Sequence, residues 1–284
     1  ENNFRNAFRP LIELGGLEFS AVSPVYGGGT VNAAFEMLTG LPSDRVLNGV
    51  IYQEYYNKLG NNLLSLPKLL SDNGYVSKAY HNFNERFWKR NVVMPKLGFE
   101  EFFGLGSMDY SGGDYFPRDK VMFDYFLSNF TGEKGFYFFE TVYSHGSYES
   151  VEDYLKKIEV AVSDIGDFVK EVMSRDQNNV VLIYADHKPA LPDFFQEKGY
   201  FASKNGRGSV PFIVIDNAID RANYFIKKAN NQPMFCVPKI FNDYYLGYYL
   251  PAFVFNEKIC SKNYDRGAID NEYPGWLYHY SLFE

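Results

Sequence analysis

The sequence predicts an α/β fold with a mostly parallel sheet. Two apolar runs of strand length, 179–185 and 210–215, alternate with segments of helical periodicity. Both runs are apolar throughout, which is typical of strands covered by helices on both faces. Nothing repeats at a fixed period and no low-complexity linker divides the 284 residues. We therefore expect one domain over 1–284, with a core to about residue 216 and a C-terminal subregion over 217–284.

The first elements are predicted from apolar spacing and from their stop signals. Residues 31–40 should form a helix, because small and apolar side chains recur at helical spacing until Gly40 and Pro42 end it. A second helix is expected over 63–73, ending at Gly74, and a short strand over 75–80.

The later elements follow the same reasoning. A β-prone run of Phe and Tyr occupies 135–143. Helical apolar spacing extends over 151–174, and the apolar runs at 179–185 and 210–215 are predicted to be buried parallel strands. The last 60 residues, which end in Trp276-Leu-Tyr-His-Tyr and a short tail, are expected to supply terminal strands and a packing element.

Composition excludes some classes of function. Asp plus Glu is 35 against 28 Lys plus Arg, a formal charge of −7, which argues against a nucleic-acid partner. Aromatic residues make up 19% of the chain; they indicate either a core built from large rings or a surface that contacts sugar or lipid. No run reaches the roughly 18 apolar residues of a membrane helix. The start, Glu1-Asn2-Asn3, is polar, unlike a signal peptide.

The two cysteines, Cys236 and Cys260, leave two interpretations open. They lack the paired spacing of a zinc site and are too few for a disulfide scaffold. They form either one disulfide in an oxidising compartment or two buried thiols.

Active sites of parallel α/β sheets lie at the carboxyl ends of strands, which selects Thr30, His145 and the pair Asp186-His187. Asp186-His187 follows an apolar run and is either a polar turn or a pair of metal ligands suited to Mn²⁺, Zn²⁺ or Mg²⁺. Three glycines, 27–29, precede Thr30 at a helix start, which favours close approach of an anion. Thr30 is a helix cap or a nucleophile.

Two further segments are rich in hydrogen-bond donors. His145 follows the Phe/Tyr strand and is either a structural turn residue or a group that donates to phosphate. Residues 81–90 follow another predicted strand, and there Arg90 has the geometry to bind a phosphate bidentately, while Trp88 can stack on a sugar or glycerol face. The alternative for this segment is a solvated loop whose Trp packs into the core.

Taken together, these segments resemble the extracytoplasmic catalytic domain of the lipoteichoic acid synthase and phosphoglycerol transferase family, in the alkaline phosphatase and sulfatase superfamily. The resemblance covers roughly residues 17–216. The matching segments occur in family order: 26–42, 80–90, 97–103, 141–148, 184–189 and 210–215.

The resemblance implies a three-layer α/β/α sandwich and a set of site residues. Thr30 would be the nucleophile and a metal ligand, with Asp186 and His187 as further metal ligands. The substrate-binding residues would be Gly29, His81, Trp88, Arg90 and His145. It also implies one divalent metal, Mn²⁺ first, with Zn²⁺ or Mg²⁺ as alternatives.

By the same resemblance, the chain would move a glycerophosphate headgroup from phosphatidylglycerol to a glycan or polyol-phosphate acceptor through a covalent phosphothreonine intermediate. The alternatives are phosphoethanolamine transfer, a phosphodiesterase, and a non-catalytic glycan- or lipid-binding domain. The expected location is extracytoplasmic, in the cell envelope or periplasm, as part of a bacterial protein held at the membrane surface by an N-terminal anchor outside this sequence.

The chain departs from the family pattern at its start. The family opens with a strand that ends in a metal-binding Glu, and here Glu1 is only a faint candidate for it. The sulfatase signature Cys-x-Pro-x-Arg is absent; the nearest match, at Cys236, lies far from the glycine loop. A sulfatase is therefore not expected.

Overall fold

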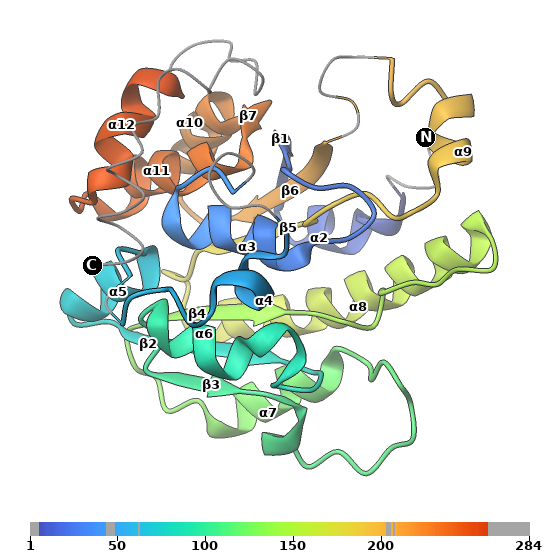
Figure 1. Ribbon diagram of the computed structural model, residues 1–284, viewed down its shortest axis with the longest axis horizontal. Coiled ribbons are helices and arrows are strands. Elements are labelled where there is room, and N and C mark those ends of the chain that lie inside the picture. Colours follow the sequence, from blue (N-terminus) through green and yellow to red (C-terminus); the bar gives the residue numbers. More distant parts are fainter. Residues whose placement is uncertain (1–5, 44–48, 62, 203–205, 207, 261–284) are drawn as a thin grey trace.

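The computed structural model describes residues 6–43, 49–61, 63–202, 206 and 208–260. Helices lie on both faces of a layer of strands (Figure 1). On one face, α3 and the helices after β6 pack on the strands; on the other face α2, α7 and α8 do so. This is the α/β architecture that the sequence predicts. Glu1 and Trp276 fall outside the described residues.

The strands form two hydrogen-bonded sheets, ordered β5-β6-β1-β7 and β3-β2-β4. Their bounds are Leu17–Val22 (β1), Val76–His81 (β2), Glu101–Phe103 (β3), Gly135–Glu140 (β4), Val181–Tyr184 (β5), Ser209–Ile215 (β6) and Gln232–Pro233 (β7). Strand β2 is parallel to both of its neighbours, whereas β6 is antiparallel to β1 and to β5. The parallel direction expected for 210–215 is therefore wrong: coverage of both faces makes a strand apolar whatever its direction.

The α-helices are Arg9–Glu13 (α2), Thr30–Thr39 (α3), Ile51–Tyr55 (α4), Leu66–Asp72 (α5), Arg90–Lys96 (α6), Lys120–Asn129 (α7), Val151–Arg175 (α8), Pro192–Glu197 (α9), Ile219–Ala229 (α10), Val237–Phe241 (α11) and Pro251–Ile259 (α12). Short 3₁₀ turns cover Phe87–Lys89 (η1), Leu105–Ser107 (η2) and Met234–Cys236 (η3), and a π turn covers Asn242–Leu246 (η4). Among the described helices, none combines the length and the apolar character needed to cross a bilayer.

Local signals set several boundaries; the end of α3 agrees with the prediction, and the start of α5 and the end of β4 differ from it. Helix α3 ends at Gly40, whose left-handed backbone (φ 71°) caps it. Helix α5 begins later than predicted, because Ser65 caps it through the Lys68 amide at 3.2 Å. Strand β4 stops at Glu140 rather than at residue 143, since Asp119 takes the next backbone amides, those of Val142 and Tyr143.

The C-terminal subregion differs from the prediction. Between residues 219 and 259 it is mostly helical, with β7 as its short strand, so the expected terminal strands are wrong for this part. Phe225, Phe235 and Ile240 pack here against β1 and β6. Tertiary burial of the rings thus overrides their β propensity. The cysteine question is also settled: Cys236 and Cys260 form a disulfide that joins η3 to the end of α12.

Candidate functional site

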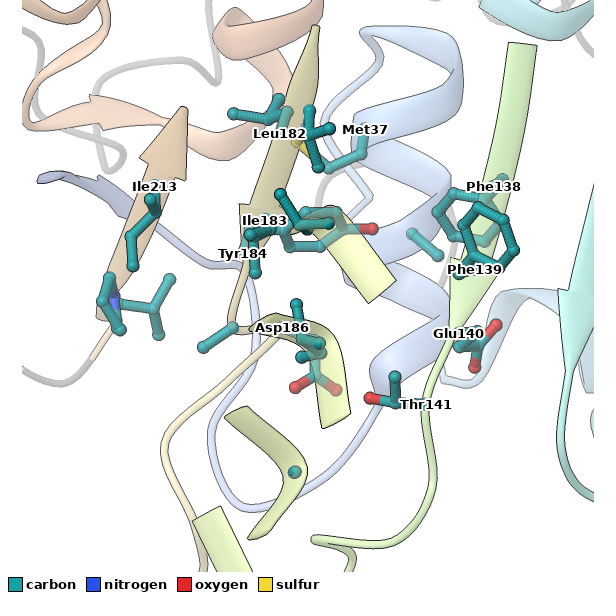
Figure 2. Close-up of a pocket in the computed structure, with 18 of the residues that line it drawn as sticks. Met37, Phe138, Phe139, Glu140, Thr141, Leu182, Ile183, Tyr184, Asp186 and Ile213 are labelled. Carbon is teal, nitrogen blue, oxygen red and sulfur yellow. The ribbon is translucent and has the colours of Figure 1, made fainter. Parts of the chain in front are cut away.

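The candidate site lies at the carboxyl ends of β4 and β5, at one end of a cavity of about 1820 Å³. Thr30, His145, Asp186 and His187 all line this cavity, although they come from three separate parts of the chain. In Figure 2, Asp186 follows β5 and Thr141 follows β4, with the cavity between the two strands. The strand-end rule therefore predicts correctly that these candidate side chains come together at one cavity.

The glycine loop brings Thr30 to this end of the cavity. Gly27 and Gly29 both have positive φ, 72° and 90°. A Cβ on Gly29 would lie 2.9 Å from a Val25 methyl carbon, and a Cβ on Gly27 would lie 3.3 Å from Ala190. Side chains are therefore disfavoured here both by backbone strain and by space. Thr30 is the first residue of α3, so its hydroxyl lies at the positive end of the helix dipole.

Asp186 and His187 meet Thr30 at one carboxylate oxygen. The Thr30 hydroxyl donates a hydrogen bond to Asp186 Oδ2, and His187 Nε2 lies 3.1 Å from the same oxygen. His187 Nδ1 is 2.8 Å from the Lys188 carbonyl oxygen. A carbonyl oxygen only accepts, so Nδ1 carries the proton. In this tautomer the Nε2 lone pair faces the side of the Asp186 carboxylate and is available to a cation.

The donor set fits a divalent ion. One hydroxyl, one carboxylate and one imidazole nitrogen in the metal-binding tautomer converge here, and Mn²⁺ and Zn²⁺ accept such mixed oxygen and nitrogen ligands. Within the described ranges, no three His, Cys, Asp or Glu side chains form a metal-type cluster. At this point the described part of the chain offers two side chains of these types, Asp186 and His187, together with the Thr30 hydroxyl.

Two residues that sequence reasoning missed fix the backbone around this group. The buried Ser23 hydroxyl, at the end of β1, donates to the carbonyl oxygen of Asp186. Lys188 donates through Nζ to the carbonyl oxygens of Gly206 and Ser209. Its own carbonyl accepts from the Gly27 amide at 3.0 Å, which ties the Asp186 segment to the glycine loop. Burial lowers the pKa of Lys188 to about 8.

The segment that carries His145 is held by a buried carboxylate that the sequence did not reveal. Asp119 Oδ1 accepts from the amides of Val142 and Tyr143, at 2.9 and 3.1 Å, and from Asn82 Nδ2 at 2.9 Å. Burial raises the pKa of Asp119 despite these bonds. The His145 ring is exposed, with its centroid 4.8 Å from that of Phe116. His145 is thus positioned at the cavity while its ring remains accessible.

Arg90 is already paired in this structure. Its guanidinium is 2% exposed, and its Nε and Nη2 groups both donate to the Glu140 carboxylate, which is 6% exposed. The two N–H groups expected to bind a phosphate bidentately are therefore engaged by Glu140. Burial alone would raise the pKa of Glu140, but the charge of Arg90 and the Arg90 hydrogen bond lower it below its usual range.

Trp88 contacts both the core and Arg90. It has left-handed backbone (φ 52°), is half-buried and packs on the cluster around α3. The Arg90 guanidinium carbon lies 5.2 Å from the centroid of the indole. The expected contact of Trp88 with a glycerol or sugar face stays a prediction, as do the substrate roles of Arg90 and His145.

His81 is buried at the end of β2 rather than exposed on a loop. It is 3% exposed, and its Nδ1 lies 2.7 Å from the carbonyl oxygen of Glu140. Burial, assisted by the positive charge of Arg90, lowers the pKa of His81 to about 4. His81 is therefore neutral in the folded chain near pH 7 and supports Glu140 from behind the cavity wall. Its expected contact with substrate stays a prediction.

The buried His81 should make folding stability depend on pH. The unfolded chain binds a proton at His81 below about pH 6.5, whereas the folded chain resists it until about pH 4. Protons then favour the unfolded state, so the free energy of unfolding should fall by about 3 kcal/mol as the pH drops through this window. Urea unfolding of wild type and His81→Asn at several pH values measures the effect. His81→Asn should flatten this slope, whereas the matched variant of the exposed His145 should not; equal slopes for wild type and His81→Asn would contradict the assignment.

Comparison with known proteins gives a family match. A family model described as Sulfatase matches residues 15–242. Among curated proteins, the chain is 29% identical over 203 residues to the "Putative cyclic beta-1,2-glucan modification protein" of Rhizobium meliloti (strain 1021). The match covers 63% of this chain and 31% of that protein. The chain thus spans about a third of the length of this relative.

Two solved structures share the fold. The lipoteichoic acid synthase LtaP from Listeria monocytogenes matches with a TM-score of 0.64 and 17% identity, covering 83% of this chain and 65% of LtaP. The Streptococcus pyogenes phosphoglycerol transferase GacH, solved with sn-glycerol-1-phosphate, matches with a TM-score of 0.61 and 17% identity over 98% of this chain and 82% of GacH. At 17% sequence identity, the structural similarity to these two proteins shows a shared fold.

Proposed function

The chain belongs to the sulfatase family, and from this premise we propose that it transfers a glycerophosphate headgroup from phosphatidylglycerol to a hydroxyl of a glycan or polyol-phosphate acceptor. One observation carries the proposal: the Thr30 hydroxyl, the Asp186 carboxylate and the His187 imidazole meet at one end of a large cavity. A hydroxyl nucleophile suits a transferase that passes through a covalent intermediate. The likeness to LtaP and GacH supports the choice of headgroup.

The first half of the reaction forms a bond between Thr30 Oγ1 and phosphorus. Asp186 Oδ2 already accepts the hydrogen bond of this hydroxyl, so it is placed to receive the proton. The bond from phosphorus to the diacylglycerol oxygen breaks, and that oxygen takes up a proton as diacylglycerol leaves. Thr30 then carries glycerophosphate as a phosphodiester.

The second half restores Thr30. An acceptor hydroxyl attacks phosphorus, its proton is lost to the site, and Thr30 Oγ1 leaves and recovers a proton. The amino end of α3 and the glycine loop favour the negative phosphoryl oxygens during both halves. We assign to the same oxygens His145, which is exposed and lines the cavity, and which donates to them when both of its ring nitrogens carry a proton.

Thr30, Asp186 and His187 would hold a divalent ion, with Mn²⁺ as the first candidate. When bound, such an ion supplies a Lewis acid that lowers the pKa of a coordinated hydroxyl. The tautomer of His187 suits this role. Its Nδ1–H donates to the Lys188 carbonyl oxygen, which leaves the Nε2 lone pair facing Asp186.

We place the domain outside the cytoplasm. The buried Cys236–Cys260 disulfide supports this, because such bonds persist in oxidising compartments. A lipid donor and a cell-envelope acceptor agree with the same location.

The test is release of diacylglycerol from vesicles of phosphatidylglycerol, with MnCl₂ or with EDTA. We expect release with Mn²⁺ and its loss with EDTA. Parallel vesicles of phosphatidylethanolamine distinguish the headgroup, and mass spectrometry of the water-soluble product distinguishes transfer from hydrolysis. Release of diacylglycerol from phosphatidylethanolamine alone would reject this function in favour of phosphoethanolamine transfer. Formation of free glycerophosphate even when an acceptor glycan is present would reject it in favour of a phosphodiesterase. Metal binding without any release would favour a binding domain.

A further inference from the structure

Four aromatic side chains form a contiguous cluster beside His145. Phe83 lies at its centre, with three further ring centroids 5.5 to 5.6 Å from its own, those of Phe87, Tyr115 and Phe116. The centroids of Tyr115 and Phe116 are 4.7 Å apart, and that of Phe116 lies 4.8 Å from that of His145. We call the four residues Phe83, Phe87, Tyr115 and Phe116 the ring platform.

The ring platform is open to solvent. Tyr115 is 75% exposed and Phe87 is 43% exposed, while Phe83 and Phe116 are half-buried. A single exposed ring is ordinary, but exposed rings that contact a common ring form an apolar patch, and such patches mark binding surfaces. The patch adjoins His145, which lines the cavity of the candidate site. A ligand on the platform therefore abuts that site.

Buried hydrogen bonds fix the platform relative to the site. Asn82, which directly precedes Phe83, is fully buried. Its Nδ2 donates to the carbonyl oxygen of Pro117 at 3.0 Å and to Asp119 Oδ1 at 2.9 Å. Pro117 directly follows Phe116. The same Asp119 oxygen accepts from two backbone amides in the loop that connects β4 to α8. The loops that carry the rings are therefore tied to one another and to the site, and such preorganisation favours binding.

The composition of the platform suits sugar rings. Its apolar members are all aromatic, and an aromatic face carries a partial negative charge that attracts the C–H groups on the face of a pyranose. A carboxylate lies beside it: Asp114, directly before Tyr115, is exposed, and the Tyr110 hydroxyl donates to its Oδ2 at 3.0 Å. Carboxylate oxygens accept hydrogen bonds from sugar hydroxyls. The surface therefore offers both stacking and hydrogen bonding to a sugar.

The charge around the platform is balanced, which favours a neutral ligand. Apart from the buried Arg90, the segments 82–90 and 109–118 carry three acidic and three basic side chains, Glu85, Asp109 and Asp114 against Arg86, Lys89 and Arg118. The guanidinium of Arg118 is also engaged by Asp164. A polyol phosphate and an anionic lipid surface both require an excess of basic side chains. These two segments do not provide that excess.

We propose that the ring platform binds sugar rings of a neutral glycan, and that this glycan is the acceptor. The glycan lies across the rings, and its sugar at the His145 end presents a hydroxyl to the site. Of the two acceptor classes in the proposed function, this surface selects the glycan over the polyol phosphate. The role as acceptor rests on the proposed transfer, whereas glycan binding does not.

Binding is measured with the 284-residue chain free of metal and lipid, so that no turnover contributes. The probes are three neutral glucose hexamers of different linkage, cellohexaose, laminarihexaose and maltohexaose, with a glycerophosphate trimer as the anionic comparison. NMR of the chain with ¹³C-labelled Tyr and Phe rings follows binding, and the Tyr115 signal is identified by its absence in Tyr115→Ala. We expect at least one hexamer to shift this signal saturably, and the trimer to leave it unchanged.

Two variants and a matched control locate the binding surface. Tyr115→Ala and Phe87→Ala should each weaken binding of that hexamer at least about fivefold, because each removes an exposed ring face. The remaining ring signals of the platform follow binding in these variants. Tyr224→Ala, which removes a ring that is 62% exposed on α10, should bind as wild type does. Urea unfolding should show the fold retained in all three, since each side chain is exposed.

The other outcomes identify a different ligand or none. Failure of all three hexamers to shift the Tyr115 signal, or unchanged affinity in both platform variants, would overturn the proposal. A shift by the glycerophosphate trimer alone would assign the platform to a polyol phosphate. Loss of binding to phosphatidylglycerol vesicles in both variants, without binding of any hexamer, would assign it to a lipid surface.

The role as acceptor has its own readout. After incubation with phosphatidylglycerol vesicles and MnCl₂, mass spectrometry should find glycerophosphate on the hexamer that binds. Release of diacylglycerol without glycerophosphate on that hexamer would refute the acceptor role. Binding of the hexamer without any release of diacylglycerol would reject the proposed function, and the acceptor role with it, while the platform would keep its ligand.

Discussion

Replacing Thr30 by alanine should reduce release of diacylglycerol from phosphatidylglycerol by at least about three orders of magnitude, because removal of a nucleophile leaves only binding and electrostatic contributions. Folding should change little. The lost hydrogen bond ends on Asp186, whose side chain is 30% exposed and can bind water instead. Initial rates with Mn²⁺ and thermal unfolding of the same preparations measure the two effects.

Two matched variants sharpen this prediction. Thr30→Val keeps the shape of the side chain and removes the hydroxyl, so it should be as inactive as Thr30→Ala. Thr30→Ser keeps the hydroxyl and should retain far more activity than either. Retention of more than about a tenth of the wild-type rate by Thr30→Ala would exclude Thr30 as the nucleophile, since no residual mechanism supplies such a rate.

The convergence of the candidate site residues could be predicted from the sequence because their signals are local. Three glycines before a helix and an Asp-His pair after an apolar strand each indicate their own environment, and the strand-end rule then brings them together. The structure agrees: Thr30 and Asp186 are hydrogen-bonded although 156 positions separate them. The helix 151–174 could be predicted for the same reason, since its apolar residues recur at helical spacing, and the structure has α8 at 151–175.

The supports of the site could not be predicted, because they depend on distant partners. Arg90 has the pattern of a free phosphate ligand, and nothing near it in sequence indicates that Glu140, 50 positions away, occupies its two N–H groups. His81 looked like the start of a donor-rich loop but is the buried last residue of β2. The partial exposure of β5 could not be predicted for a similar reason. An apolar run predicts a buried strand but does not identify the residues that would cover it.

The pairing of Arg90 with Glu140 leads to the second large effect, on stability. Glu140→Gln should lower the free energy of unfolding by about 3–5 kcal/mol, because it leaves a guanidinium that is 2% exposed without its counter-charge. Chemical denaturation at pH 7 measures the loss. The loss should become smaller at acidic pH, because the pKa of Glu140 is lower in the folded chain than in the unfolded chain. The stability that ionised Glu140 contributes is fully present above its unfolded-state pKa and disappears as the pH falls through its folded-state pKa.

Asp164 offers a matched control for this effect. It is 3% exposed and also holds an arginine by two hydrogen bonds, but that arginine, Arg118, is 48% exposed and can return to water. Asp164→Asn should therefore cost much less than Glu140→Gln. Combining Glu140→Gln with Arg90→Met removes the stranded charge and should recover much of the loss. If both single carboxylate variants cost the same, burial of Arg90 is not the cause, and Arg90 is then free enough to turn from Glu140 to a substrate phosphate.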